Sequence, residues 1–150
     1  MDDGKKNRQA QTRLAAQLMK RILVHFRGQI DEALRPQGVT TAQLQVLYAI
    51  RNEPGASGAQ LARSCYMTPQ SAQSLLKGLE EGGWIVRVKD KVNDRILVAQ
   101  LTRSGEELLE TAEKAARVIE KRVWKGVSDD AVATLNAVLE QCLGNLDSES

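Results

Sequence analysis

Apolar residues recur at helical spacing along the N-terminal part of this chain. Within residues 12–35 they form a slowly drifting stripe of Leu14, Leu18, Ile22, Phe26, Ile30, Ala33 and Leu34. Spacings of three and four residues place side chains on one face of an α-helix. The pattern therefore predicts one long helix, which must stop before Pro36 because the residue preceding a proline disfavours the helical backbone.

The C-terminal segment carries the same kind of pattern twice. Thr102 is a candidate N-cap for a helix with apolar positions at Leu108, Ala112, Ala115, Ile119 and Val123. Gly126-Val127-Ser128 interrupts the pattern, and the acidic pair Asp129-Asp130 suits the positive end of a last helix. The apolar stripe of that helix is Leu135, Val138, Leu139, Cys142, Leu143 and Leu146.

Short polar motifs in the middle of the chain mark the starts of further helices. Thr40 with Gln43, and Ser57 with Gln60, match the capping box, in which each side chain bonds the other residue's backbone N–H. The helix opened by Ser57 ends near Ser64, and Cys65-Tyr66-Met67 predicts a tight connection. Thr68 is the N-cap of the next helix, with Pro69 at the first helical position, where no N–H is needed.

That next helix is followed by a hairpin. Ala72, Leu75, Leu76 and Leu79 form its buried face, and Gly82-Gly83 ends it, since glycine adopts the left-handed conformation cheaply. Two strands, Trp84–Val88 and Arg95–Leu101, then flank a charged tip. The order predicts a mainly α fold with a small β-hairpin wing, a winged helix-turn-helix over residues 36–102.

The polar face of the helix after Thr68 favours DNA reading. Gln70, Ser74, Lys77 and Glu81 lie opposite the leucines, with Ser71 and Gln73 on the flanks. A recognition helix presents its N-terminal residues to base edges, and glutamine can pair with adenine through two hydrogen bonds. The candidate DNA contacts on this helix are Thr68, Pro69, Gln70, Ser71, Gln73, Ser74 and Lys77.

The two end segments carry more apolar surface than one winged helix can cover. A chain that cannot bury its stripes alone buries them against a copy of itself. We therefore expect a homodimer formed by residues 12–35 and 103–146, with two reading helices about one helical turn, roughly 10 bp, apart on a pseudo-palindrome. Residues 12–146 are predicted to form a single domain, with a disordered arm at 1–11 and a tail at 147–150.

Composition narrows the class of protein. The net charge of +2 conceals an asymmetry, because residues 1–35 carry +4, residues 60–103 carry +3 and residues 104–150 carry −5. A basic reading unit (residues 60–103) beside an acidic C-terminal segment (residues 104–150) is typical of a protein that binds a polyanion through one face. With no apolar leader or membrane span in the sequence, we expect a soluble, cytoplasmic protein.

The sequence offers little material for catalysis or metal binding. Two cysteines and one histidine cannot supply a four-ligand zinc site, and no phosphate loop or dinucleotide fingerprint is present. We expect no enzyme activity, cofactor or metal. Cys65 and Cys142 are expected to be reduced thiols, although oxidation of Cys65, beside the reading helix, would disturb DNA docking.

Several motifs together resemble the MarR family (multiple antibiotic resistance regulators). The segment from Leu34 to Leu44 is similar to the family's L-x-P-x-G-L-T-x-x-Q pattern. The stretch from Leu79 to Arg87 resembles its recognition unit and the start of its wing, and Leu101-Thr102-Arg103-Ser104-Gly105 resembles its L-T-x-x-G signature. The resemblance covers roughly residues 12–146. It implies dimeric regulators, usually repressors, that leave DNA on binding small, often phenolic, molecules or on thiol oxidation.

The wing departs from the family at one position. The family's D-x-R motif places its arginine at Arg95, but Asn93 stands at the aspartate position. Asp94 is expected to project to the opposite face of an extended strand. Arg95 remains a candidate for the minor groove or a phosphate, with Lys89 and Lys91 as candidate phosphate contacts.

The resemblance also implies an effector pocket between the dimer helices and the reading unit. His25, Tyr48 and Trp124 are candidates there for binding a small aromatic acid, though no motif assigns them. The preferred interpretation is a sequence-specific repressor relieved by such a ligand. Two alternatives stay open: a winged-helix protein-interaction module without DNA binding, and a repressor that senses thiol oxidation through Cys65.

Overall fold

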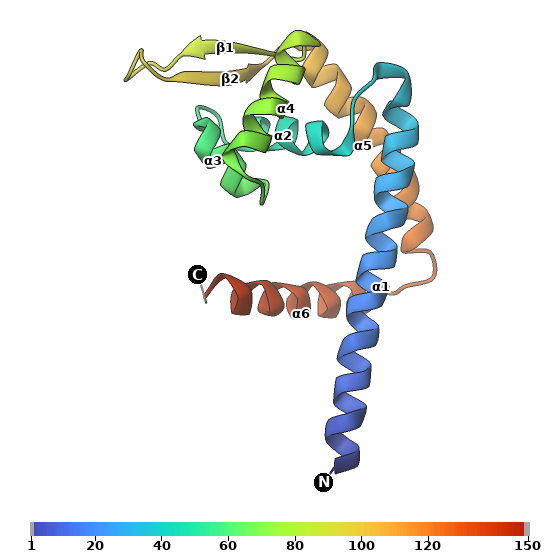
Figure 1. Ribbon diagram of the computed structural model, residues 1–150. Coiled ribbons are helices and arrows are strands. Elements are labelled where there is room, and N and C mark those ends of the chain that lie inside the picture. Colours follow the sequence, from blue (N-terminus) through green and yellow to red (C-terminus); the bar gives the residue numbers. More distant parts are fainter. Residues whose placement is uncertain (1, 149–150) are drawn as a thin grey trace. The chain divides into compact units, whose positions relative to one another are not determined.

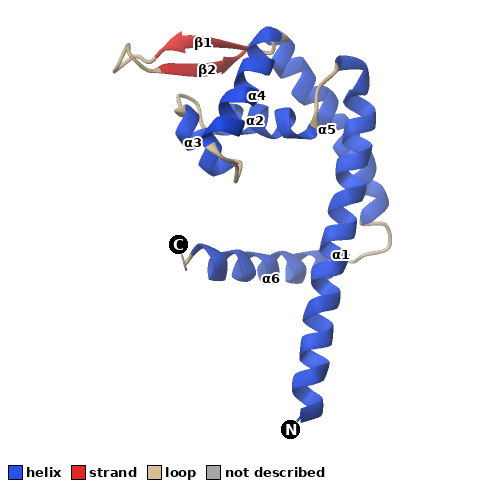
Figure 2. Ribbon diagram, viewed as in Figure 1, coloured by secondary structure: helices blue, strands red, loops and turns tan. Residues whose placement is uncertain are grey.

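The computed structural model describes residues 2–148, and its contacts divide the chain into two compact units, Met1–Arg117 and Val118–Ser150. Helices and one hairpin make up the described chain (Figures 1 and 2). In order, the elements are α1 (Asp2–Leu34), the 3₁₀ turn η1 (Arg35–Gln37), α2 (Thr41–Asn52), α3 (Gly58–Ser64), α4 (Pro69–Glu81), β1 (Ile85–Lys89), β2 (Leu97–Leu101), α5 (Arg103–Val123) and α6 (Asp129–Asp147). The mainly α class with a two-stranded wing is confirmed.

Helix α1 is longer than the sequence predicted. We expected residues 1–11 to be a disordered arm, but the helix begins at Asp2. The segment lacks an apolar stripe, yet its lysine, arginine, glutamine and alanine residues favour helix, and Asp3 lies at the positive helix end. At its other end the helix stops at Leu34, and Gly38 follows η1 with a φ of 71°, a left-handed conformation that suits glycine.

The core of the first unit is formed where α2, α3, α4, the hairpin and α5 meet. Its most deeply buried large side chains are Leu34, Val46, Leu47, Leu61, Leu79, Ile85 and Leu109. Both predicted capping boxes are present, because Thr40 with Gln43 and Ser57 with Gln60 make their reciprocal hydrogen bonds. These local bonds determine where α2 and α3 begin, and packing of their apolar faces then brings α4 against both helices.

The wing follows α4 directly. Gly83, with a φ of 79°, accepts the left-handed position after the helix, and the N–H of Trp84 donates to the carbonyl of Leu79. Strands β1 and β2 pair antiparallel, with Ile85 opposite Leu101 and Lys89 opposite Leu97. The predicted second strand was therefore too long, because Arg95 lies in the turn at the tip and not in a strand.

The long helices leave apolar side chains exposed in the single chain. On α1, Leu14, Leu18, Met19, Ile22 and Leu23 are each 44–49% exposed. Ser128 caps α6, and none of the residues of α6 is buried. Among the helices of the described chain, none is both long and apolar enough to cross a membrane.

Candidate nucleic-acid interface

The start of α4 is set by its own first residues. Thr68 Oγ1 accepts a hydrogen bond from the N–H of Ser71 at 3.1 Å and lies 2.9 Å from the Ser71 hydroxyl. Pro69 occupies the first turn, as predicted. Such a cap stabilises a helix by about 1 kcal/mol, and it leaves the remaining N–H groups of the first turn directed outward.

The predicted polar face of α4 is accessible. The side of the helix formed by Ala72, Leu76 and Leu79 is buried, and the candidate contacts on the other side are all exposed: Thr68, Pro69, Gln70, Ser71, Gln73, Ser74 and Lys77. The positive end of the helix dipole lies at the same end as most of these polar residues. This surface can approach a polyanion without desolvating a carboxylate in its first two turns.

Gln73 differs from its neighbours on α4 because its side-chain amide already makes contacts within the protein. Its Oε1 accepts a hydrogen bond from Arg87 Nη2 at 3.2 Å, and Arg87 Nε lies 3.4 Å from Glu80 Oε2. Gln73 Nε2 occupies the space that a Cβ on Gly58 would need, so the Gln73 amide also packs against α3. Arg87 was not among the site residues predicted from the sequence, although it ends the segment that resembles the family's recognition unit and the start of its wing. The alternation of strand side chains could have found it, since Arg87 lies on the same strand face as buried Ile85.

The tip of the wing is an ordered turn. Asp90 Oδ2 accepts from the N–H groups of Val92 and Asn93 at 3.2 and 3.1 Å. Asn93 Oδ1 accepts from the N–H of Arg95 at 3.2 Å. The asparagine at the family's aspartate position therefore orders the turn through its side-chain carbonyl, without a carboxylate. Asp94 lies in this turn, so the expectation that it projects from an extended strand was wrong.

The predicted cations of the wing are exposed on and beside this turn. Lys89 ends β1, while Lys91 and Arg95 belong to the tip, and all three are exposed. Val92, between them, is 95% exposed. The tip therefore carries exposed cations together with the carboxylates of Asp90 and Asp94.

The base of the wing is held by the L-T-x-x-G segment. Thr102 Oγ1 donates to the carbonyl of Gly83 at 2.7 Å and accepts from the N–H of Gly105 at 3.2 Å. A Cβ on Gly105 would lie closer than 3.0 Å to the carbonyl oxygen of Trp84, so only glycine lets α5 start this close to β1. This motif is structural, because it seats the hairpin on the helix that follows.

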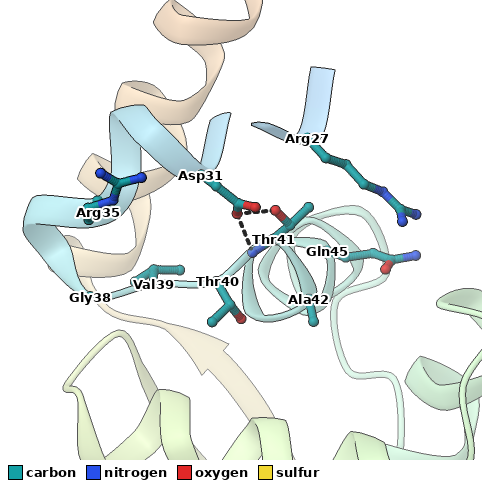
Figure 3. Close-up of a pocket in the computed structure, with 9 residues that line it drawn as sticks. All are labelled: Arg27, Asp31, Arg35, Gly38, Val39, Thr40, Thr41, Ala42 and Gln45. Atoms are coloured by element: carbon teal, nitrogen blue, oxygen red, sulfur yellow. Dashed lines mark hydrogen bonds between the residues drawn. The ribbon is translucent and has the colours of Figure 1, made fainter. Parts of the chain in front are cut away.

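A groove of about 630 Å³ lies between the end of α1 and the start of α2 (Figure 3). Asp31 points across it and accepts hydrogen bonds from both the N–H, at 3.1 Å, and the hydroxyl of Thr41. Arg27 lines it from α1, Arg35 from η1 and Gln45 from α2. The groove thus combines the cations Arg27 and Arg35, the second of which lies 3.7 Å from Glu32 Oε2, with the Asp31 carboxylate and the apolar side chains of Val39 and Ala42.

The effector residues suggested by the sequence do not line this groove. His25 is exposed on α1, and Trp124, directly after α5, is 39% exposed. Tyr48 is half-buried, with the Arg51 guanidinium 5.0 Å from its ring centre and Glu113 Oε1 2.6 Å from Arg51 Nη2. Burial raises the pKa of Tyr48, Glu113 raises it further, and Arg51 lowers it. Helical periodicity could not identify the groove, because its residues come from the end of α1, the loop beyond it and the start of α2.

Cys65 lies in the core rather than at the surface. Its side chain is 4% exposed, and Gln45 Nε2 donates to its carbonyl oxygen at 3.3 Å. Burial raises the pKa of the Cys65 thiol, and the nearby charge of Glu53 raises it further. Since the thiolate is the reactive form, this environment works against the oxidation-sensing alternative. In the described chain no cluster of three or more histidine, cysteine or acidic residues could hold a metal ion.

Comparison with known proteins supports the resemblance to the MarR family. The sequence model of the MarR family matches residues 37–96. The HTH-type transcriptional repressor Rv2887 of Mycobacterium tuberculosis is 34% identical over 106 residues, which cover 71% of this chain and 76% of that protein.

Two solved structures share the fold. CouR from Rhodococcus jostii RHA1, bound to p-coumaroyl-CoA, has a TM-score of 0.72 and 24% identity, covering 83% of this chain and 88% of that one. A mutant of S. aureus MepR bound to an oligodeoxyribonucleotide has a TM-score of 0.61 and 22% identity, covering 88% and 97%. On these comparisons the chain belongs to the MarR family of transcriptional regulators, in agreement with its capped α4, its ordered wing and its L-T-x-x-G segment.

Proposed function

We propose that this protein is a sequence-specific DNA-binding repressor that acts as a homodimer and is released from DNA by a small ligand. The observation that carries the proposal is the exposed, carboxylate-free polar face on the first two turns of α4, capped by Thr68 and followed by a cationic wing. A solvated helix face with no such partner would carry acidic residues among its basic ones.

The candidate residues divide into two groups by their chemistry. Gln70 and Ser74 have free side chains on the outer face of α4, so we assign them to base edges in the major groove. Thr68, Pro69 and Ser71 surround the helix N-terminus, which suits a phosphate. Arg95 at the wing tip is assigned to the adjacent minor groove, with Lys89 and Lys91 on the phosphates beside it.

The dimer follows from the exposed apolar side chains of the long helices. The stripe on α1 that includes Leu14, Leu18 and Ile22 is nearly half exposed, and α6 buries none of its residues within one chain. Covering these surfaces with a second copy removes apolar area from water at about 25 cal/mol per Å². A two-fold dimer also supplies two reading helices for a pseudo-palindromic operator.

The groove between α1 and α2 is our candidate for the effector site. Arg27 and Arg35 favour an anionic ligand, while Val39 and Ala42 offer it apolar contact. A small aromatic acid has both properties, and the fold neighbour CouR was solved with p-coumaroyl-CoA, which carries a phenol and several anionic groups. A ligand that displaces Asp31 from Thr41 would change the angle at which α1 joins the reading unit.

The proposal is tested by fluorescence anisotropy with DNA from upstream of the protein's own gene and with a shuffled duplex, across a salt series. We expect tight binding to the first duplex, weakening linearly on a log–log salt plot. Gln70→Ala should cost about 1–3 kcal/mol at one base position. Gln11→Ala, on α1 and away from the reading helix, is the matched control. Absence of binding at every salt concentration would favour the protein-interaction alternative.

A further inference from the structure

The space between α4 and the hairpin contains an arginine that the DNA-contact assignments do not use. A groove of about 490 Å³ lies there, lined by Gln73, Lys77, Glu80, Arg87 and Leu97. Arg87 spans it from β1 to α4, with one nitrogen on Gln73 and another facing Glu80. The Arg87 side chain is 25% exposed and that of Glu80 is 50% exposed, so both remain accessible from the groove.

Duplex geometry indicates what must cross this groove. Adjacent major and minor grooves of DNA are separated by one sugar-phosphate strand. With α4 in the major groove and the wing tip in the neighbouring minor groove, that strand has to pass between α4 and the hairpin, which contact each other at their base. The protein groove between them therefore faces phosphates, and it presents the cations Lys77 and Arg87 against one carboxylate, Glu80.

We propose that Arg87 and Lys77 form a phosphate-binding site for the strand that separates the two DNA grooves, and that Gln73 positions Arg87 for this contact. The inference rests on the proposed DNA-binding function. A guanidinium has five N–H donors in a planar fork, so Arg87 can keep its bond to Gln73 while other N–H groups turn to a phosphate. The phosphate competes with Glu80 for Arg87, and Glu80 therefore limits the affinity.

This assignment changes the role of Gln73. A glutamine that reads adenine needs both its amide oxygen and its amide nitrogen for the base. The Gln73 oxygen is occupied by Arg87, and its nitrogen packs against Gly58 of α3. Gln73 thus connects α3, α4 and β1, and it acts on DNA through the wing arginine as a positioning residue.

The experiment measures binding of the full-length protein to its upstream duplex at a series of salt concentrations. Each neutralising variant, Arg87→Gln or Lys77→Gln, should lower the log–log salt slope by about 2, since a dimer loses two phosphate contacts at about 0.9 each. If variant and wild type bind equally in 1 M salt, this slope change corresponds to about 60-fold weaker binding at about 0.1 M salt. Glu80→Gln should act in the opposite direction and tighten binding, and because Glu80 is half exposed this variant tests the site even if Arg87→Gln does not fold.

The matched controls are Arg103→Gln and Glu107→Gln. These residues form a more exposed ion pair at 3.1 Å within the first turns of α5, at the base of the wing and away from its tip. Both variants should leave the salt slope unchanged. Wild-type binding with a steep slope that persists in Arg87→Gln and Lys77→Gln would overturn this inference alone, whereas failure of the wild type to bind would remove the proposed function as well.

Gln73 is tested by combining variants. Gln73→Ala should weaken binding by a similar factor on operators that differ at single base pairs, and it should add little in an Arg87→Gln background because it acts through Arg87. Circular dichroism melting checks that each variant is folded. A loss confined to one base pair, or a full additional loss in the double variant, would return Gln73 to base reading and overturn its positioning role.

Discussion

Replacing Gly105 by alanine is expected to destabilise the protein, because Gly105 lies where the start of α5 packs against the base of the wing. The added Cβ would lie within 3.0 Å of the Trp84 carbonyl oxygen and 3.4 Å from Leu101 Cδ2. The first of these neighbours is backbone, so the start of α5 and the start of β1 must move apart. Ordinary carbon–oxygen contacts in proteins lie at about 3.3–3.6 Å, so the added Cβ would be far too close to the carbonyl oxygen. Because that oxygen belongs to the backbone, a change of side-chain rotamer cannot relieve the clash.

The expected loss of stability in Gly105→Ala has two parts. Overpacking of a buried position costs about 1–3 kcal/mol. Separating α5 from the hairpin also weakens the hydrogen bonds of Thr102 to Gly83 and Gly105, each worth about 0.5–1.5 kcal/mol. We therefore expect a loss of about 2–4 kcal/mol, which lowers the melting temperature by roughly 5–15 °C for a chain of this size.

The assay is thermal and urea unfolding followed by circular dichroism at one fixed protein concentration, because a dimer's melting temperature depends on concentration. Gly4→Ala is the matched control, since Gly4 lies in α1, outside the residues assigned to the dimer, with nothing within 4 Å of an added Cβ. That change should stabilise the helix by at most about 1 kcal/mol. Unchanged stability in Gly105→Ala would refute the proposed steric role of this glycine.

Four further outcomes are expected. Thr68→Ala removes the cap on Ser71 and should cost about 1 kcal/mol of stability, whereas Thr68→Ser should retain it; equal melting curves for both would contradict the capping role. Arg95→Ala should weaken binding across many DNA sequences and flatten the salt slope, and an unchanged slope would remove Arg95 from the contacts. In the Cys142→Ser variant a thiol reagent should modify Cys65 slowly, because that residue is only 4% exposed, and fast modification would contradict its burial in the core. Because burial raises the Cys65 pKa above its ordinary 9.0, the associated stability is present at neutral pH and falls as the pH rises above 9.0, which alkaline melting curves can check.

Local sequence signals predicted most of the reading unit. The capping boxes and the Thr68 cap join residues three positions apart, so neighbours in the sequence decide where α2, α3 and α4 begin. The leucine stripe of α4 likewise predicted its buried and exposed faces. The same reasoning failed at the arm before residue 12, because the absence of an apolar stripe does not prevent good helix formers from extending a helix.

By itself, then, the sequence determined the starts of α2, α3 and α4, the polar face of α4, the presence of the wing and the family, since each depends on residues close together in the chain. Only the tertiary structure decided which side chains meet across elements. Gln73 and Arg87 are 14 positions apart, Asp31 and Thr41 are 10 apart, and the close approach of Gly105 to Trp84 needs α5 placed against β1. No periodicity encodes such contacts, because they depend on how the packed helices and the hairpin are oriented, and that orientation is set by burial of the whole core.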